Sequence, residues 1–471
     1  MNQLKIIITL CLISITTIGN AQNKKPNIIF ILADDLGYAD VGCYGQQKIK
    51  TPYIDALAKS GMSFTQFYSG STVCAPARTT FMTGLHTGHS DIRGNKTFAP
   101  EGQFPLPDSI KTFPMLLQKS GYYTAAFGKW SMGYITTSGD PQKKGFDDFF
   151  GYNCQSLAHD YYPDHLWNNH NRIDYPNNPT KFTDYSADII QNKIIETINQ
   201  QDDKRPFFLY LPYTLPHADL TVPHDSVYDS YVALFNEQPK TITNKKDTTG
   251  KPFEPYPHAA YAAMVARLDK YVGEIVALVH KKGLDENTLI IFTSDNGPHK
   301  EGGGDPEFFK STAGMRGIKR DLYEGGIREP LIVSWKNHVQ AGAINQQPFA
   351  LWDFYPTFLA MAGIKDATKT DGLSIVPALM SKQQPNHKYF YWELHESGGK
   401  QAVRWGKWKG VKNDVSIKTI VTTELYNLET DPFEKNNIAA QFPAIVKQID
   451  AYIKEAHTYN KDWPLLKSGE Q

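Results

Sequence analysis

Residues 27–35 of the chain read Asn-Ile-Ile-Phe-Ile-Leu-Ala-Asp-Asp, an apolar run that ends abruptly in two carboxylates. An unbroken run of this kind is typical of a strand that is buried on both faces. Such strands belong to parallel sheets covered by helices, in which ligands bind beyond the carboxyl ends of the strands. The stretch therefore predicts an α/β fold with Asp34 and Asp35 at a ligand site.

Three further apolar runs end in the same way. They are residues 123–127, followed by Gly128 and Lys129; residues 207–211, followed shortly by His217; and residues 288–294, followed by Asp295 and Asn296. Helical patterns lie between the runs, the clearest having apolar residues at Met264, Leu268, Tyr271, Ile275 and Val279. The alternation favours a layered α/β fold. Because all four runs carry polar residues at the same end, we expect one site assembled from distant segments.

Length and composition indicate how the chain is organised. At 471 residues it exceeds the size at which one hydrophobic core usually stops growing. We therefore expect a large domain over residues 22–365 and a smaller α+β domain over residues 366–471. Residues 388–393 and 402–411 predict antiparallel strands there, and a final helix would pack on them. Lys plus Arg equals Asp plus Glu at 49 each, so no global positive charge points to nucleic acid.

The first 21 residues have the pattern of a cleaved secretory signal. Lys5 precedes an apolar stretch over residues 6–18, and the small residue Ala21 stands at the expected cleavage point. The apolar stretch is too short to span a bilayer comfortably, and no later segment has the length of a membrane helix. We therefore expect a secreted or periplasmic protein without a membrane span.

Cleavage would leave Cys43, Cys74 and Cys154, an odd number for an exported protein. Cys43 and Cys154 could form a disulfide or be small buried apolar residues, and the sequence leaves both open. Cys74 differs, because it begins the segment Cys-Ala-Pro-Ala-Arg at residues 74–78. This segment resembles the Cys-x-Pro-x-Arg motif of the sulfatase family, in which a maturation enzyme oxidises the cysteine to formylglycine.

Further segments match the same family in the right order. Residues 121–130 look like its second motif, while the Asp34-Asp35 pair, residues 294–297 and residues 319–326 match three other elements. The resemblance covers about residues 27–363. Within the family, the chain resembles secreted bacterial carbohydrate sulfatases. This resemblance implies an alkaline-phosphatase-like α/β/α sandwich with a smaller C-terminal α+β domain that contains an antiparallel sheet.

Four residues at the strand ends suggest a metal site. Asp34, Asp35, Asp295 and Asn296 supply only oxygen ligands, which a hard cation such as calcium prefers. Adjacent aspartates are more often a solvated turn or a helix cap, but here both pairs follow predicted buried strands. The sequence contains no Cys/His set at zinc spacing. By resemblance, one Ca²⁺ ion would bind these four residues together with the modified Cys74.

The resemblance also implies a reaction. Hydrated formylglycine at position 74 would carry two hydroxyls, of which one attacks sulfur and expels the sugar alcohol and the other then ejects sulfate. Lys129 and Lys319 match the lysines that contact the sulfate, with Arg320 as the competing choice for Lys319. Arg78 matches the arginine that positions the modified residue.

His217 and Ser131 complete the expected catalytic set. His217 resembles the family histidine near the leaving oxygen, where an imidazole that titrates near neutral pH can act as a general acid. At Ser131 the chain departs from the family, which commonly has histidine directly after Gly-Lys-Trp. That histidine contacts the formylglycine hydroxyl, whereas serine can hydrogen-bond there but is a poor base. The departure weakens the assignment of the second step more than that of the activity.

The substrate is less strongly specified. Residues 154–167 are dense in groups that suit sugar hydroxyls and ring faces, although an aromatic loop packed on the core would have a similar composition. The candidate sugar contacts are His159, Asp160, His165 and Trp167. We expect a sulfated saccharide, with sulfated galactose or N-acetylgalactosamine at a chain end as the first candidates. Glucosamine, uronic acid, choline and aryl sulfates remain open.

Two other functions fit part of the pattern. A phosphate or phosphonate ester hydrolase of the same superfamily would share the fold, but its two-metal members need additional histidine and aspartate ligands. A non-catalytic relative that binds sulfated glycans would fit Ser131. Such a protein would not need a modifiable cysteine at position 74.

Overall fold

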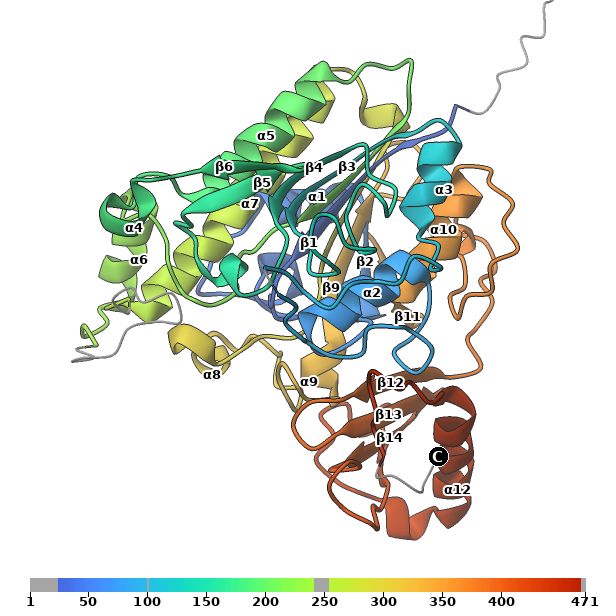
Figure 1. Ribbon diagram of the computed structural model, residues 1–471. Coiled ribbons are helices and arrows are strands. Elements are labelled where there is room, and N and C mark those ends of the chain that lie inside the picture. Colours follow the sequence, from blue (N-terminus) through green and yellow to red (C-terminus); the bar gives the residue numbers. More distant parts are fainter. Residues whose placement is uncertain (1–23, 100, 241–253, 467–471) are drawn as a thin grey trace, which may run out of the picture.

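The computed structural model describes residues 24–99, 101–240 and 254–466 (Figure 1). The predicted signal peptide, residues 1–21, lies outside the described residues. Within the described ranges, no helix combines the length and the apolar composition that crossing a membrane requires.

A mixed sheet of 11 strands forms the centre of the larger body. The strands are β1 Asn27–Ala33, β2 Met62–Tyr68, β3 Tyr123–Lys129, β4 Asp148–Tyr152, β5 His165–Asn168, β6 Asn171–Asp174, β7 Phe207–Pro212, β8 Thr288–Ser294, β9 Arg328–Ser334, β10 Ala343–Asn345 and β11 Phe349–Ala350. Their order is β10-β2-β9-β8-β1-β7-β3-β4-β5-β6, with β11 paired to β2. The four runs predicted from the sequence are the adjacent, parallel strands β8, β1, β7 and β3. Their carboxyl ends therefore lie side by side.

Helices cover both faces of this sheet (Figure 1). The helices of this body are α1 Pro52–Ser60, α2 Cys74–Thr83, α3 Phe113–Lys119, α4 Asn178–Lys181, α5 Ser186–Gln200, α6 Ser226–Phe235, α7 Pro257–Lys281, α8 Pro306–Phe309, α9 Glu324–Ile327, α10 Phe354–Met361 and α11 Val376–Leu379. Side chains of β1 alternate between two cores: Ile29 and Ile31 pack with α1, α5 and α7, and Phe30 packs with α2, α3 and α10. The predicted α/β/α sandwich is confirmed.

A second sheet lies beyond α11 and is antiparallel, in the order β12-β13-β14-β15. Its elements are β12 Phe390–Leu394, β13 Lys400–Trp405, β14 Trp408–Asn413, β15 Glu424–Asn427 and the covering helix α12 Pro443–Ala456. The predicted small α+β unit is confirmed. The run 402–411 is not one strand, because the chain turns at Gly406 and Lys407 between paired Trp405 and Trp408.

A buried ion cluster, here the Glu393 cluster, joins this sheet to the larger body. The Glu393 carboxylate accepts hydrogen bonds from Arg93 Nη1 at 2.8 Å, His395 Nε2 at 2.8 Å, His457 Nδ1 at 2.7 Å and the Tyr391 hydroxyl at 2.7 Å. Burial alone would raise the pKa of Glu393. The hydrogen bonds of the two histidines and the charge of Arg93 outweigh burial and hold that pKa below its usual value.

The structure also answers the open question about two cysteines. Cys43 is exposed on a short 3₁₀ helix over Gly42–Tyr44, Cys154 is buried, and both are free thiols. They form no disulfide. The alternative that both are buried apolar residues holds for Cys154 and is wrong for Cys43, because the chain comes to the surface at residues 42–45, after the buried Val41.

Candidate active site

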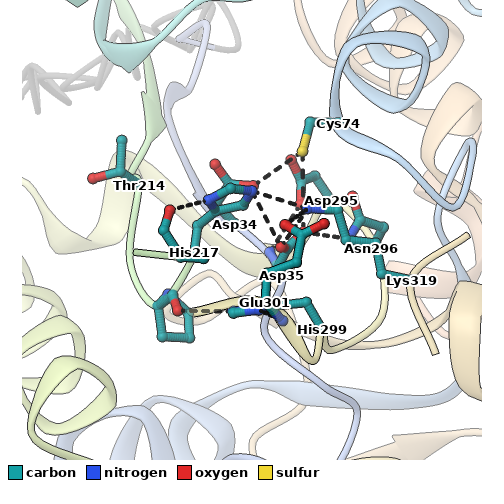
Figure 2. A network of polar contacts seen from close by, with 12 residues as sticks. Asp34, Asp35, Cys74, Thr214, His217, Asp295, Asn296, His299, Glu301 and Lys319 are labelled. Atoms are coloured by element: carbon teal, nitrogen blue, oxygen red, sulfur yellow. Dashed lines mark hydrogen bonds and ion pairs between the residues drawn. The ribbon is translucent and has the colours of Figure 1, made fainter. Parts of the chain in front are cut away.

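The predicted metal and sulfate residues meet where four parallel strands end (Figure 2). Asp34 and Asp35 follow β1, Asp295 and Asn296 follow β8, and Lys129 is the last residue of β3. Each side chain is fully buried. Because the strands are neighbours in one sheet, residues far apart in the sequence converge on one point.

Cys74 approaches this point from α2, of which it is the first residue. All ten residues of α2 are buried, and the helix ends at Gly84, whose φ of 72° suits glycine in a left-handed cap. The Cys74 thiol donates to Asp34 Oδ1 at 3.3 Å and lies 4.0 Å from Asp35 Oδ1. The start of the helix is thereby fixed against the carboxylates.

The protonation state of Cys74 follows from this position. Burial, followed by the charge of Asp34, raises the pKa of the thiol well above its usual value. A helix N-terminus normally lowers a thiol pKa, but here burial and the carboxylate outweigh it. Unmodified Cys74 is therefore a neutral thiol, which is a poor nucleophile.

Burial and neighbouring charges shift the pKa values of two carboxylates of the site in opposite directions. Burial, followed by the charge of Asp34, raises the pKa of Asp295 to about 7. For Asp34 burial would also raise the pKa, but surrounding positive charges, led by Lys129, hold it below its usual value. Asn296 Nδ2 donates to Asp35 Oδ1 at 2.5 Å, while the buried Asn296 Oδ1 has no hydrogen-bond partner. A buried acceptor without a donor is uncommon in a folded protein and indicates a position at which a ligand can bind.

Each carboxylate is paired with at least one buried cation, and Asp34 also lies 3.3 Å from Arg78 Nη2. The pairs are Lys129 Nζ with Asp34 Oδ2 at 2.6 Å, Arg78 Nη2 with Asp295 Oδ2 at 2.7 Å, and Lys319 Nζ with Asp35 Oδ2 at 2.8 Å. Arg78 also donates through Nε to the same Asp295 oxygen at 3.0 Å and through Nη1 to the Lys129 carbonyl at 2.5 Å. The guanidinium thus holds the ends of β3 and β8 together.

Lys319 reaches the carboxylates and its neighbour Arg320 does not. Lys319 Nζ also lies 2.9 Å from His217 Nε2 and 3.3 Å from Glu301 Oε2. Arg320 has a side chain that is 38% exposed and pairs with Glu301 at 2.5 Å and Glu396 at 3.3 Å. The two adjacent cations therefore face different surroundings.

His217 lies in the loop after β7 and is buried. Its Nδ1 is 2.5 Å from the Ala218 carbonyl oxygen, so Nδ1 carries the hydrogen and Nε2 faces Lys319. Burial, followed by the charge of Lys319, lowers the pKa of the imidazole well below its usual value. His217 is therefore neutral in this state of the site.

Ser131 follows β3 by two residues in a left-handed conformation, with φ of 67°. It is fully buried, and its Oγ has no hydrogen-bond partner. The hydroxyl is therefore available to a group that is added to the site. The structure does not supply an imidazole at this position.

Two residues beside the carboxylates were missed by the sequence analysis. The ligating atoms of His299, Glu301 and Asp35 all lie within 4.8 Å of one another. A signal for them existed, because both follow Asp295-Asn296 within six residues in the loop after a predicted strand. Position after a strand could therefore have extended the predicted site to His299 and Glu301.

A first cavity of about 820 Å³ opens onto His217 and Lys319. His159 lines it, with its ring edge to face against that of His217 at a centroid distance of 4.5 Å. The buried His159 Nδ1 has no hydrogen-bond partner. This residue is the one predicted sugar contact that lies beside the catalytic candidates.

A second cavity of about 550 Å³ is lined by Asp160 and His165. Trp167 does not line it, but its ring centroid lies 5.8 Å from that of His165, and its indole N–H donates to Glu101 at 3.0 Å. Glu101, which the sequence analysis did not select, lines this cavity as well. Of the predicted sugar contacts, His159 lines the first cavity, Asp160 and His165 line the second, and Trp167 lines neither.

Comparisons with known proteins agree with this geometry. The sulfatase family profile matches residues 26–364, and the profile described as N-sulphoglucosamine sulphohydrolase, C-terminal, matches residues 317–458. N-acetylgalactosamine-6-sulfatase of Rattus norvegicus is 30% identical over 412 residues, covering 82% of this chain and 71% of the rat protein. N-acetylgalactosamine-6-O-sulfatase of Bacteroides thetaiotaomicron is 26% identical over 496 residues, covering 93% and 94%.

Solved structures show the same architecture. Ps i-CgsB in complex with k-i-k-neocarrahexaose has a TM-score of 0.75 at 29% identity, covering 94% of this chain and 96% of that one. A protein solved in complex with D-glucosamine-2-N,6-O-disulfate has a TM-score of 0.72 at 24% identity, covering 92% and 97%. The second likeness establishes the fold alone.

Proposed function

The chain belongs to the sulfatase family, and on that premise we propose that it removes sulfate from a sulfated carbohydrate by means of one calcium ion and a formylglycine made from Cys74. As a sulfuric ester hydrolase, it would act first on sulfated galactose or N-acetylgalactosamine, since two of its relatives are named N-acetylgalactosamine 6-sulfatases. The signal pattern in residues 1–21 supports export to the periplasm or beyond, and the conversion of Cys74 requires a maturation enzyme.

One observation carries the proposal. Cys74 stands at the start of a fully buried helix, with its sulfur directed at Asp34 and with Lys129 paired to the same carboxylate. As a thiol it has no catalytic form, because its raised pKa keeps the proton on sulfur. A buried, unreactive cysteine surrounded by charged groups is explained by chemical conversion of that cysteine.

The residues around Cys74 fit a calcium ion. The unpartnered Asn296 Oδ1 and the raised pKa of Asp295 are both features that a cation would relieve. Asp34, Asp35, Asp295 and Asn296 would hold the ion through oxygen atoms, which calcium prefers. When bound, calcium would supply positive charge that polarises an oxygen of the nucleophile or of the sulfate.

The chain's own cations would hold the sulfate. Lys129 and Lys319 pair with carboxylates that calcium would neutralise, which leaves their ammonium groups to bind anionic oxygens. Arg78 would keep its place, because two of its nitrogens bond Asp295 and a third bonds a backbone carbonyl. Formylglycine, once hydrated, would supply the hydroxyl that attacks sulfur.

His217 would move the proton that the leaving sugar oxygen needs. Its Nδ1 is committed to the Ala218 carbonyl, so Nε2 is the atom that can hold and deliver this proton. Burial, followed by the charge of Lys319, keeps the pKa of His217 low, and a bound anionic ester would raise it. Protonation of Nε2 would therefore follow substrate binding.

The direct test is peptide mass spectrometry across residues 74–78, on protein purified from its native host, combined with sulfate release from galactose 6-sulfate and N-acetylgalactosamine 6-sulfate. We expect an aldehyde or its hydrate at Cys74, and sulfate release that Cys74→Ala abolishes and Cys43→Ala, at an exposed thiol, leaves intact. An unmodified thiol in every molecule, with no sulfate released, would instead favour a protein that binds sulfated glycans without cleaving them.

A further inference from the structure

Asn95 lines the first cavity and also holds the start of α2, the helix that begins with Cys74. The Ala75 N–H donates to Asn95 Oδ1 at 3.2 Å. Since a backbone N–H can only donate, the accepting atom is the amide oxygen, and the amide nitrogen takes the other position. Among the described residues, Asn95 Nδ2 has no acceptor. Asn95 therefore offers a fixed donor to a ligand in the first cavity, close to residue 74.

Arg320 lines the same cavity with a side chain that is 38% exposed. Its Nη1 donates to Glu301 Oε1 at 2.5 Å, and its Nε donates to Glu396 Oε2 at 3.3 Å. Its backbone carbonyl accepts from Lys400 Nζ at 2.7 Å. Within the part of the chain that the structure describes, Nη2 has no acceptor. Because two carboxylates hold this one guanidinium, Arg320 offers the cavity a rigid donor rather than an excess of positive charge.

Glu396 connects these two donors. It lies in the loop between β12 and β13, in the smaller unit, whose sheet packs beside α9 (Figure 1). Its Oε1 accepts from the Asn95 backbone N–H at 2.9 Å, and its Oε2 accepts from Arg320. Glu396 does not itself line the cavity. One carboxylate of the smaller unit thus fixes two walls of a cavity in the larger body.

We propose that Asn95 Nδ2 and Arg320 Nη2 donate hydrogen bonds to oxygen atoms of the sugar that carries the reacting sulfate, and that Glu396 is the residue that positions both donors. This inference rests on the proposed sulfatase function, in which Lys129 and Lys319 hold the sulfate itself. A sugar presents hydroxyl oxygens outside its sulfate, and a plain aryl sulfate presents none. The two donors therefore favour a sulfated saccharide over an aryl sulfate.

The test compares sulfate release from a sulfated sugar and from phenyl sulfate, which has no oxygen outside its sulfate. The sugar is N-acetylgalactosamine 6-sulfate or galactose 6-sulfate, whichever reacts faster. The kcat/KM of each substrate is expressed per molecule with converted Cys74, as measured by mass spectrometry. The quantity that decides is the ratio of kcat/KM for the sugar to kcat/KM for phenyl sulfate.

Two variants remove one donor each. Asn95→Asp keeps the oxygen that accepts from Ala75 and removes the amide donor. The charge that it adds acts on the sulfate of both substrates and cancels in the ratio. Arg320→Lys keeps a positive charge between the two carboxylates and removes the planar fork. We expect each variant to lower the ratio by about tenfold.

A third variant tests the positioning role. In Glu396→Gln, the glutamine oxygen can still accept from the Asn95 N–H, but its amide nitrogen cannot accept from Arg320. We expect the ratio to fall by about three- to tenfold, and kcat/KM for phenyl sulfate to stay nearly unchanged. Combined with Arg320→Lys, it should lower the ratio no further than Arg320→Lys alone. Glu455→Gln, the same substitution at an exposed pair of the smaller unit, is the control and leaves the ratio unchanged.

The outcomes separate this inference from the function beneath it. A ratio that stays at the wild-type value in Asn95→Asp or in Arg320→Lys, a loss of the same size for both substrates, or cleavage of phenyl sulfate alone would overturn the inference and leave a sulfuric ester hydrolase standing. An unchanged ratio in Glu396→Gln would overturn the role assigned to the smaller unit. If protein with converted Cys74 releases no sulfate from either substrate, the proposed function fails, and the inference fails with it.

Discussion

The Glu393 cluster and the carboxylates around Cys74 both bury several charges, yet they differ in how completely those charges are paired. Glu393 accepts four hydrogen bonds, and its pKa is held low. Around Cys74, the pKa of Asp295 is raised to about 7 and Asn296 Oδ1 has no donor. The Glu393 carboxylate has its partners within the protein, although His395 Nδ1 has none, whereas the carboxylates around Cys74 include one with a strongly raised pKa.

The difference shows which buried charges indicate function. A carboxylate that is fully hydrogen-bonded contributes to how elements pack, and here it joins the antiparallel sheet to the larger body. A buried carboxylate whose pKa is raised, and which lies beside an acceptor without a hydrogen-bond partner, indicates a site for a ligand or a reaction. Burial alone would have selected both clusters as sites.

The largest expected effect is on the Cys74 side of this comparison. Cys74→Ala should lower kcat/KM for sulfate release by at least about 10⁴-fold, because the proposed nucleophile is lost. Its cost to the free energy of unfolding, measured in urea, should be about 1 kcal/mol for the small cavity. If the variant kept a tenth of the activity, the nucleophile would lie elsewhere and the comparison would fail.

The Glu393 cluster should respond in the opposite manner. Glu393→Gln should lower the free energy of unfolding by about 3–5 kcal/mol, because Arg93 is left as a buried charge without its carboxylate. The folded fraction should retain its sulfate release. Glu455→Gln, which breaks an exposed pair with Lys388 at 2.8 Å, is the control and should cost less than about 1 kcal/mol. A large loss of activity in folded Glu393→Gln would show that this cluster also serves the reaction.

Calcium should stabilise one region only. At 100 times its dissociation constant, calcium should raise the free energy of unfolding by about 2.7 kcal/mol over the chelated protein. Asn296→Leu removes the unpartnered oxygen and should abolish that gain, whereas Glu393→Gln should keep it. Calorimetry and urea unfolding both measure it. An equal gain in Asn296→Leu would place the ion away from the Cys74 site.

The smallest expected effect is on how the free energy of unfolding depends on pH. The sign of this dependence differs between the Cys74 site and the Glu393 cluster. In calcium-free protein, Asp295 has its pKa raised from 3.8 to about 7, so stability falls as pH rises through this window. The pKa of Glu393 is lowered from 4.5, so its contribution is full above that pH and is lost as pH falls through the folded value. Urea midpoints should be measured from pH 3 to 8. Asp295→Asn should weaken the pH dependence of stability at the upper end of this range, and Glu393→Gln should weaken it at the acid end. The same profile in both variants would remove the distinction.

The sequence predicted the four central strands and the site at their ends because the patterns that indicate them are short and local. The runs that became β1, β3, β7 and β8 are continuous in the chain, and their polar residues follow directly, so their convergence needed only the geometry of parallel strands. The choice between Lys319 and Arg320 could not be made in that way. It depends on the tertiary contacts, which place Lys319 on Asp35 and Arg320 on Glu301 and Glu396.

Other features depend on contacts that no local pattern contains. Arg93 and Glu393 are 300 residues apart and meet only because the second sheet packs on the larger body. Glu101 contacts a hairpin more than 60 residues away, and that contact fixes the carboxylate at the edge of the second cavity. Such pairs are set by tertiary packing, and a single sequence gives no period or motif from which to infer them.

The complete burial of Cys74 constrains when its proposed conversion can occur. The residue is 0% exposed and lies in the first turn of a helix that is covered along its whole length. A maturation enzyme has to enclose residues 74–78 in its own cleft, and it cannot do so after α2 has packed beneath the sheet. Oxidation and folding therefore compete in time during synthesis or export. The ratio of the two rates sets the fraction of molecules that become active. In a molecule that folds before oxidation, Cys74 remains a thiol.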